Sequence, residues 1–397
     1  MRDASEVSTT KIYYEDPYAE EFTAKVLSYH NGDLVLDRTC FFPEEGGQSP
    51  DAGTIAGFRA EDVQIKDGEI HHRITLPEGA RAPEPGETVS GKIDWAHRFS
   101  NMQQHSGEHI FSGIIHKKYG FDNVGFHLSD SEVTLDFNGV VPEEGIEEAE
   151  WRANEVIAEN LEIQVLFPTR GELDKMDYRS KLELSGDVRV VVIPGIDACA
   201  CCAPHVRRTS EIGLLKVISC QNYKGGVRIS ILCGLRAARL FIKEHDILAK
   251  TANYLTTSPD EIYNLTVKAK SENAALKSAL RKAAAAEIQT KIDGIEGGGG
   301  NVCIFQEELD TAVARGAVNN LVEKTSGFCG IFVGNTEEGY KYIIGKKGGD
   351  ARQFSKILSE KYGARGGGQP SMVQGSVKAP EEEIRELFQS SASESCS

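Results

Sequence analysis

The segment Met102-Gln-Gln-His-Ser-Gly-Glu-His109 of this 397-residue chain places two imidazoles four positions apart, which constrains the fold around them. Residues four apart share one face of a helix, so His105 and His109 can point at a single ion. A second pair of metal-binding side chains follows in Cys201-Cys-Ala-Pro-His205. One thiolate with three imidazoles suits zinc better than calcium or magnesium. We therefore predict a fold that brings His105, His109, Cys201 and His205 together around one zinc ion.

The length and composition are those of a multidomain cytoplasmic protein. A single compact core rarely fills so long a chain, so several domains are expected. No run of eighteen apolar residues is present, and the first ten residues lack the apolar core of a signal peptide. Nine cysteines, three of them in Cys199-Ala-Cys-Cys202, indicate reduced thiols and metal ligands rather than a disulfide framework.

The charge is strongly acidic overall but locally basic. A net charge of -16 argues against a protein that coats nucleic acid without discrimination. The stretch that follows His205 holds nine Lys or Arg against three acids, the basic residues being Arg207, Arg208, Lys216, Lys224, Arg228, Arg236, Arg239, Lys243 and Lys250. This run is either a solvated surface without a partner or a local surface for RNA.

Residues 1–94 predict a β domain. Short β-type runs at 22–29 and 34–42 flank Asn31-Gly32, which is a hairpin signal. Further turn residues follow at Gly46-Gly47 and Lys66-Asp-Gly68. A small β-barrel or sandwich is the expected result.

The rest of the chain predicts an α+β, multidomain protein. Residues 95–234 mix a helix with largely antiparallel strands and should form the zinc-binding domain. Residues 235–293 are almost free of Gly and predict one or two long helices, a hairpin broken at Ser258-Pro259. Residues 294–397 should begin with a flexible Gly-rich linker and form a small α/β domain. The acidic, then Ser-rich tail from Glu381 predicts disorder at its end.

Three motifs give the chain a specific resemblance. They are Leu36-Asp-Arg-Thr-Cys-Phe-Phe-Pro-Glu-Glu-Gly-Gly-Gln48 with Asp51-Ala-Gly53, the His105 segment, and Asp197-Ala-Cys-Ala-Cys-Cys-Ala-Pro-His-Val-Arg-Arg-Thr-Ser-Glu-Ile-Gly213. In order and spacing, the first 230 residues resemble the free-standing alanyl-tRNA editing proteins of the long form, which are related to the editing domain of alanyl-tRNA synthetase. Gly366-Gly-Gly-Gln-Pro-Ser-Met-Val-Gln-Gly375 resembles the glycine-rich word of that synthetase's C-terminal, DHH-associated domain.

The resemblance implies a trans-editing hydrolase that removes serine, glycine or both from mischarged tRNA(Ala), without aminoacylation activity. It implies that Thr39 and Gln48 lie at the editing pocket, and that Asp197 anchors its loop or contacts substrate. Glu108 is either a general base or a solvent-facing helix residue. Four protein ligands would close the metal site, so a catalytic, a structural and a substrate-positioning zinc all stay open.

The chain departs from the family in its third motif, which usually reads Cys-Gly-Gly-Thr-His. Cys202-Ala-Pro204 stand in the middle here. Proline fixes φ and lacks the N–H that glycine would offer, so the shape of the loop is in question. Cys202 could compete for the metal, but Cys201 has the family's spacing to His205 and is the predicted ligand.

On this interpretation the basic run becomes a candidate path for the acceptor stem of tRNA(Ala), with Arg207, Arg208, Lys224 and Arg228 as contacts. The C-terminal domain, through Gly366, Gly367 and Gly368, would hold the tRNA farther from its end. The long helices would set the reach between the domains or form a homodimer through their apolar faces, and the C-terminal domain is the other candidate interface for a homodimer.

Two rival functions remain. His105-Ser-Gly-Glu-His109 also satisfies His-x-x-Glu-His, the signature of inverzincin metallopeptidases. That function predicts a further, usually acidic, ligand and gives no purpose to Cys201 and His205. A non-catalytic tRNA-binding zinc protein is the other alternative.

Overall fold

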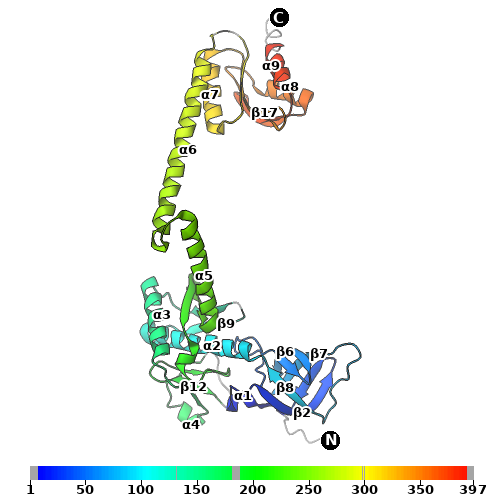
Figure 1. The fold of residues 1–397 in the computed structure, drawn as a ribbon, viewed down its shortest axis with the longest axis vertical. Coiled ribbons are helices and arrows are strands. Elements are labelled where there is room, and N and C mark those ends of the chain that lie inside the picture. The colour runs from blue at the N-terminus through cyan, green and yellow to red at the C-terminus, as the bar shows by residue number, and fades with distance from the viewer. Residues whose placement is uncertain (1–7, 131, 181–187, 297, 299, 391–397) are drawn as a thin grey trace. The chain divides into compact units, whose positions relative to one another are not determined.

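The chain forms two compact units, residues 1–250 and 251–397, in a computed structural model that describes residues 8–130, 132–180, 188–296, 298 and 300–390 (Figure 1). Each unit combines helices with β-sheets, which confirms the predicted α+β, multidomain class. The boundary between the units falls within one helix, α5 (Gly234–Leu255), so the predicted four-part division stays a prediction. Among the described residues, no helix has both the length and the apolar character needed to span a bilayer.

The N-terminal strands close into a six-stranded barrel in the order β2-β3-β7-β6-β5-β8. Their bounds are Glu21–His30 for β2, Asp33–Leu36 for β3, Gly53–Ile55 for β5, Phe58–Lys66 for β6, Glu69–Thr75 for β7 and Thr88–Ile93 for β8. Phe22, Ala24 and Val26 alternate with exposed residues along β2, as a strand with one buried face requires. Beside the barrel, β1 (Thr10–Lys11) and β4 (Arg38–Thr39) pair in parallel, and α1 spans Ile12–Glu15.

Helix α2 (Trp95–Tyr119) is the centre of the first unit. The Asp94 side chain caps its start by accepting from the His97 N–H, and Gly120, at φ 70°, ends it. Every residue from 101 to 113 is buried. A helix buried on all sides must be packed between other elements, which is the setting in which polar side chains on it can meet partners from several segments.

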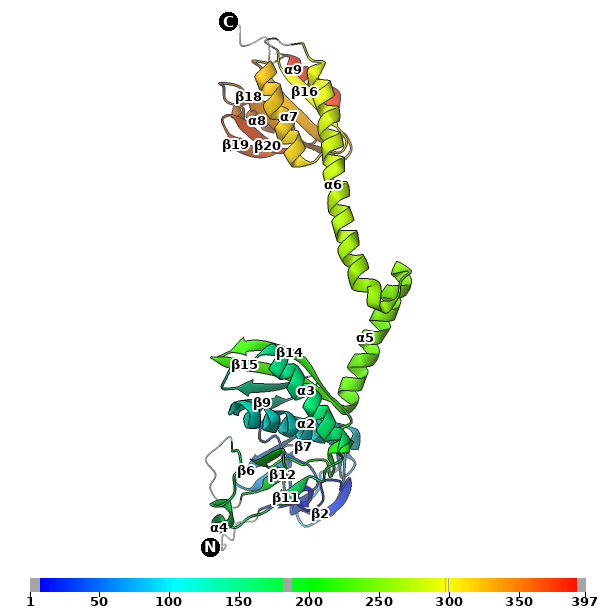
Figure 2. The same cartoon turned by 90° about the vertical axis from the view of Figure 1, so that its left-hand side faces the viewer.

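Two sheets surround α2. An antiparallel sheet of four strands has the order β14-β15-β10-β9 and packs against α2 and α3 (Figure 2). A sheet of three strands has the order β11-β12-β13, and β13 leads directly into the loop with Cys201. The bounds are Asn123–Leu128 (β9), Val133–Phe137 (β10), Glu143–Ala158 (α3), Gln164–Leu166 (β11), Arg170–Leu173 (α4), Val190–Ile193 (β12), Asp197–Ala200 (β13), Thr209–Ile212 (η1), Leu215–Tyr223 (β14) and Gly226–Cys233 (β15).

A buried ion pair joins the barrel side to α2. Arg98 and Asp51 are both almost fully buried, and the guanidinium bonds the carboxylate through two of its nitrogens. Arg98 also donates to the carbonyl oxygens of Pro17 and Cys40, while Asp51 accepts from the Phe42 N–H at 2.6 Å. The first motif of the sequence is thereby held against the start of the helix that carries the second motif.

The second unit contains a five-stranded sheet in the order β16-β17-β18-β20-β19. Its bounds are Val302–Gln306 (β16), Phe328–Asn335 (β17), Gly339–Lys346 (β18), Arg365–Gln369 (β19) and Met372–Val377 (β20), with helices at Ile262–Asp293 (α6), Thr311–Lys324 (α7), Arg352–Tyr362 (α8) and Glu381–Ser390 (α9). The break at Ser258-Pro259 is confirmed, because η2 (Pro259–Glu261) separates α5 from α6. The hairpin arrangement of these helices and the flexible character of the Gly-rich linker stay predictions.

Two features of the second unit were not predicted from the sequence. The glycine-rich word begins as an edge strand, β19, because Gly lets its backbone pair closely with β20 over the Tyr342 ring. The start of the acidic tail is the helix α9, whose Ile384 and Phe388 are buried against the sheet. The predicted disorder at residues 391–397 lies outside the described residues.

Candidate metal centre

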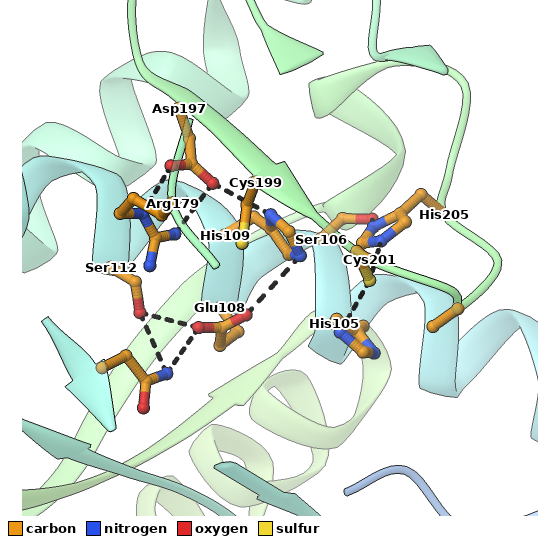
Figure 3. Close-up of polar contacts among 12 residues, drawn as sticks. His105, Ser106, Glu108, His109, Ser112, Arg179, Asp197, Cys199, Cys201 and His205 are labelled. Carbon is orange, nitrogen blue, oxygen red and sulfur yellow. Dashed lines mark hydrogen bonds and ion pairs between the residues drawn. The ribbon is translucent and has the colours of Figure 1, made fainter. Parts of the chain in front are cut away.

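Two segments nearly a hundred residues apart meet in one buried cluster (Figure 3). His105 and His109 come from α2, and Cys201 and His205 come from the loop after β13. One ligand atom from each lies within 4.8 Å of the others. The Cys201 sulfur is 3.5 Å from His105 Nε2 and 3.3 Å from His205 Nε2. Cys202, in contrast, is not part of the cluster and packs towards the barrel core.

These distances match tetrahedral zinc coordination. Zinc binds sulfur at about 2.3 Å and nitrogen at about 2.0–2.1 Å, so two such ligands at a tetrahedral angle lie about 3.6 Å apart. The measured 3.3 and 3.5 Å are close to that value. The donor set and its spacing therefore fit zinc.

Each imidazole is held through Nδ1 by a different partner. Gln48 Oε1 accepts from His105 at 2.7 Å, Ser106 Oγ lies 3.0 Å from His205, and Asp197 Oδ2 accepts from His109 at 2.9 Å. A neutral ring whose Nδ1 proton is engaged in this way has its lone pair on Nε2. Partners of this kind orient the rings for a metal.

The protonation states also suit metal binding. Burial raises the pKa of Cys201, but the charges of His105 and His205 and its hydrogen bonds outweigh burial and bring that pKa well below the ordinary thiol value. Burial lowers the pKa of His205 to about 3, against the raising effect of the Cys201 thiolate. For His109, burial opposes the charge, yet the Asp197 and Cys201 contacts raise its pKa well above the ordinary value. A metal binding at His109 must displace a proton.

The chain is similar to known proteins over most of its length. The family of class II (A) tRNA synthetases matches residues 4–97, and the threonyl and alanyl tRNA synthetase second additional domain matches residues 188–230. The alanyl-tRNA editing protein AlaX-L of Pyrococcus horikoshii is 30% identical over 94% of this chain and 96% of its own length.

The chain belongs to the alanyl-tRNA editing proteins of the AlaX-L type. It is also similar to alanine–tRNA ligases: 33% identical over 64% of the chain for that of Ignicoccus hospitalis, and 29% over 93% for that of Pyrococcus furiosus. It covers 29% and 42% of those ligases, so it corresponds to less than half of each.

In this AlaX-L relative, Glu108 is buried, which excludes the solvent-facing alternative. Its Oε1 accepts from the Ser112 hydroxyl at 2.7 Å and from Asn123 Nδ2 at 2.6 Å. Its Oε2 lies 3.8 Å from His109 Nε2. The carboxylate is thus held at the edge of the cluster.

The two predicted pocket residues lie in different surroundings. Gln48 contacts the cluster through His105, and its Nε2 is buried with no hydrogen-bond partner among the described residues. Thr39 is buried at β4, where its hydroxyl bonds His72 Nε2 at 2.9 Å and accepts from the Phe41 N–H at 3.1 Å. The hydroxyl of Thr39 therefore has partners on the barrel side, and the structure gives it no contact with the four ligands.

A close backbone approach delivers Gln48 to the cluster. Gly47 has φ +84°, and a Cβ on it would lie 2.3 Å from the carbonyl oxygen of Phe126 in β9. The Leu128 N–H donates to Gly47 O at 2.7 Å, and the Ser49 N–H donates to Leu128 O at 3.1 Å. Glycine is required here because a side chain would separate the barrel loop from β9.

The predicted tRNA contacts differ in how their charges are used. Arg228 makes a two-pronged ion pair with Asp136 at 2.6 and 2.7 Å. Arg207 bonds Asp16 and stacks 4.1 Å over Tyr18, while Arg208 donates to Asn160. Lys224 lies in the β14–β15 turn, 5.0 Å from the centre of the Tyr223 ring. Gly366, Gly367 and Gly368 lie in the second unit, on β19.

Sequence reasoning missed three residues that support the site. Ser106, which contacts His205, stands inside the His105 motif, so its position between the ligands was an available signal. Asn123 and Arg179, which contact Glu108 and Asp197, lie in segments without a recognisable pattern.

Proposed function

We propose that this editing protein is a trans-acting aminoacyl-tRNA deacylase that hydrolyses mischarged Ser-tRNA(Ala) and Gly-tRNA(Ala). One zinc ion would be bound by His105, His109, Cys201 and His205. The buried cluster, in which three oriented imidazoles face one thiolate, carries the proposal. Its match to an AlaX-L protein over nearly the full length of both supports action in trans.

The need for such an activity follows from the limits of binding discrimination. A pocket for alanine cannot exclude the smaller glycine, and an added hydroxyl is rejected only by about a hundredfold in apolar pockets. Serine and glycine are therefore attached in error. A second site that hydrolyses the wrong ester corrects this, and tRNA(Ala) is the partner that the family name implies.

Zinc, when bound, would supply a positive charge that polarises the ester or orients water. The chain's own groups would do the rest. Glu108, held by Ser112 and Asn123, would take a proton from the attacking water and return it to the leaving ribose oxygen as the ester bond breaks. Gln48, fixed by His105, would present its Nε2 donor to the charge that develops on the ester oxygen. Thr39 would lie on the barrel side of the pocket, where its hydroxyl, held by His72, would recognise serine or position the water.

The tRNA would lie along the exposed basic residues near the second ligand pair. Arg207, Arg208 and Lys224 are the main candidates for phosphate contacts. Arg228 would contribute less, because Asp136 already compensates its charge. Gly366, Gly367 and Gly368 would contact the tRNA with the backbone of β19. A homodimer through the exposed apolar residues of α5 or α6, such as Ile242 and Leu276, is part of the same proposal.

The decisive assay measures release of radiolabelled serine or glycine from tRNA(Ala), with Ala-tRNA(Ala) as the control substrate. We expect fast loss of serine or glycine and retention of alanine. Glu108→Gln should lower kcat by about 10² to 10⁴ with zinc retained, whereas Glu155→Gln, at an exposed position on α3, should not.

Two outcomes would contradict the proposal. Zinc-loaded protein that binds tRNA(Ala) but hydrolyses no ester would point to the non-catalytic alternative. Peptide hydrolysis with no ester hydrolysis would point to the peptidase, which the cluster disfavours because its remaining ligands are Cys201 and His205 rather than an acid.

A further inference from the structure

A second group of potential ligands lies beside the cluster and shares His109 with it. His109, Asp197 and Cys199 are all buried, and their ligand atoms also lie within 4.8 Å of one another (Figure 3). By composition alone this group resembles a second metal site, with His109 as a bridge between two ions. The surroundings of Asp197 decide between a second metal and another role.

The guanidinium of Arg179 already occupies the carboxylate of Asp197. Arg179 Nε donates to Oδ1 at 2.8 Å and Nη2 donates to Oδ2 at 2.9 Å. Oδ2 also accepts from His109 Nδ1 at 2.9 Å. Both oxygens are therefore bonded to positive or polar donors, and a dication placed there would face the guanidinium at close range.

The backbone of Arg179 fixes the guanidinium in this position. Its N–H donates to Ala198 O at 2.8 Å, and its carbonyl oxygen accepts from the Ala200 N–H at 2.9 Å. These two bonds clamp Arg179 along β13 on either side of Cys199, with which it forms a bridge. The Arg179 side chain is about nine-tenths buried, and that of Asp197 almost fully. Burial and the two parallel hydrogen bonds together fix the orientation of the Arg179 and Asp197 side chains.

We propose that Arg179 is a positioning residue for the metal centre, which holds Asp197 as the acceptor for His109 and takes the place of a second cation. The charge count agrees. A buried Asp197 without Arg179 would be an uncompensated carboxylate next to a ring that must stay oriented. With Arg179 present, Asp197 orients His109 and adds no net charge. This inference rests on the proposed zinc site but not on the proposed substrate.

The test measures zinc affinity by chelator competition, together with the absorption spectrum of the cobalt-loaded protein. Arg179→Met should weaken zinc binding by about tenfold or more, the usual effect of losing a partner of a ligand. Arg179→Lys, which keeps the charge, should restore part of the affinity. Asp197→Asn combined with Arg179→Met should lose little beyond Asp197→Asn alone, because both act through His109. The parent protein should bind one ion per chain.

A matched control separates this role from a general loss of folding. Arg228→Met breaks another two-pronged Arg–Asp pair in the same unit, with Asp136, and should leave zinc affinity and the cobalt spectrum unchanged. Urea unfolding of the metal-free variants checks that both fold. Parent-like zinc affinity in folded Arg179→Met, an equal loss in Arg228→Met, or a second equivalent of metal in the parent would each overturn the proposal. None of these outcomes depends on ester hydrolysis.

Discussion

The two glycine-rich motifs of this chain, Gly46-Gly47 and Gly366 to Gly368, have different structural roles. At Gly46-Gly47 the chain turns with φ of +63° and +84°, and Gly47 is pressed against the Phe126 carbonyl. At Gly366 to Gly368 the backbone lies on an exposed edge strand, and a Cβ on Gly367 would meet nothing within 4 Å. The Gly46-Gly47 motif brings the side chain of Gln48 to His105. The Gly366 to Gly368 motif leaves backbone groups at the edge of a sheet.

Similar glycine-rich motifs can thus either bring a side chain to a buried cluster or leave a strand exposed at the edge of a sheet. In the first unit, glycine permits a contact between segments that must be close for the metal centre to form. In the second, glycine permits strand pairing over Tyr342 while β19 remains exposed. Substitutions at Gly46 and Gly47 should therefore affect the metal centre and stability, whereas substitutions in β19 should mainly affect the binding of tRNA.

The largest expected effect is that of Cys201→Ala. Loss of the thiolate removes one of four ligands, so zinc affinity should fall by at least about a hundredfold and hydrolysis with it. Cys202→Ala, next to it but outside the cluster, should keep zinc. Zinc content after dialysis against a chelator distinguishes the two. If Cys202→Ala lost zinc and Cys201→Ala kept it, the ligand assignment would be wrong.

Arg98→Met tests how strongly the first motif, which contains Asp51, is held against α2. Breaking a buried ion pair leaves Asp51 unpaired, so the free energy of unfolding should fall by about 3–5 kcal/mol. Arg152→Met, which removes surface ion pairs with Glu155 and Glu159, should cost about 0–1 kcal/mol. Urea unfolding measures both. Equal losses would show that Arg98 is no stronger a link than a surface pair.

A pH titration separates the barrel from the metal centre. Burial lowers the pKa of His72 to about 4, below the value of about 6.5 in an unfolded chain. The unfolded chain then binds the proton more tightly, so the stability due to neutral His72 is complete above pH 6.5 and declines towards pH 4. The total decline is roughly 3 kcal/mol. His72→Gln should lack this part of the pH dependence. A variant with the parent's profile would assign the decline to other groups.

Gly47→Ala should act on the metal centre through Gln48. Its positive φ costs about 1–2 kcal/mol for alanine, and the clash with Phe126 adds to this and should lower kcat. Gly57→Ala is a matched control, because Gly57 has φ +80° and open space around it. It should cost similar backbone strain but leave kcat unchanged. An unchanged kcat in Gly47→Ala would mean that the loop does not position Gln48.

The smallest effect is expected on β19. Gly366→Ala would place a Cβ 2.3 Å from the Tyr342 hydroxyl, so tRNA affinity should fall about fivefold, equivalent to about 1 kcal/mol. Gly367→Ala should change it less than about twofold. Neither should alter zinc affinity or kcat at saturating tRNA. A loss of zinc in either variant would contradict the claim that only the Gly46-Gly47 motif affects the metal centre.

Local patterns allowed the four ligand candidates, the helix break and the first hairpin of the barrel to be predicted from sequence. His105 and His109 share a helix face by spacing alone, and Asn31-Gly32 marks its hairpin. The residues that hold the ligands were harder to predict. Arg179 and Asn123 reach the site only through the packing of distant segments, and no local rule specifies such contacts.

Other differences arose because burial is a property of the whole fold. A glutamate on a helix is usually exposed, yet both sheets and the barrel cover α2, so the carboxylate of Glu108 is buried. The start of the tail at Glu381 is acidic, yet Ile384 and Phe388 four residues apart give it one face that packs on the sheet. The sequence contained that spacing, and the acidic composition obscured it.

The three partners of the imidazoles come from a barrel loop, from α2 and from β13. A nascent chain therefore has no complete site until His205 has been synthesised and all three segments have docked. Loading of the metal would then report on assembly of the first unit, and an incompletely folded molecule would hold the ion weakly. The synthesis of a new molecule and its acquisition of metal would thus be ordered in time by where these residues lie in the chain.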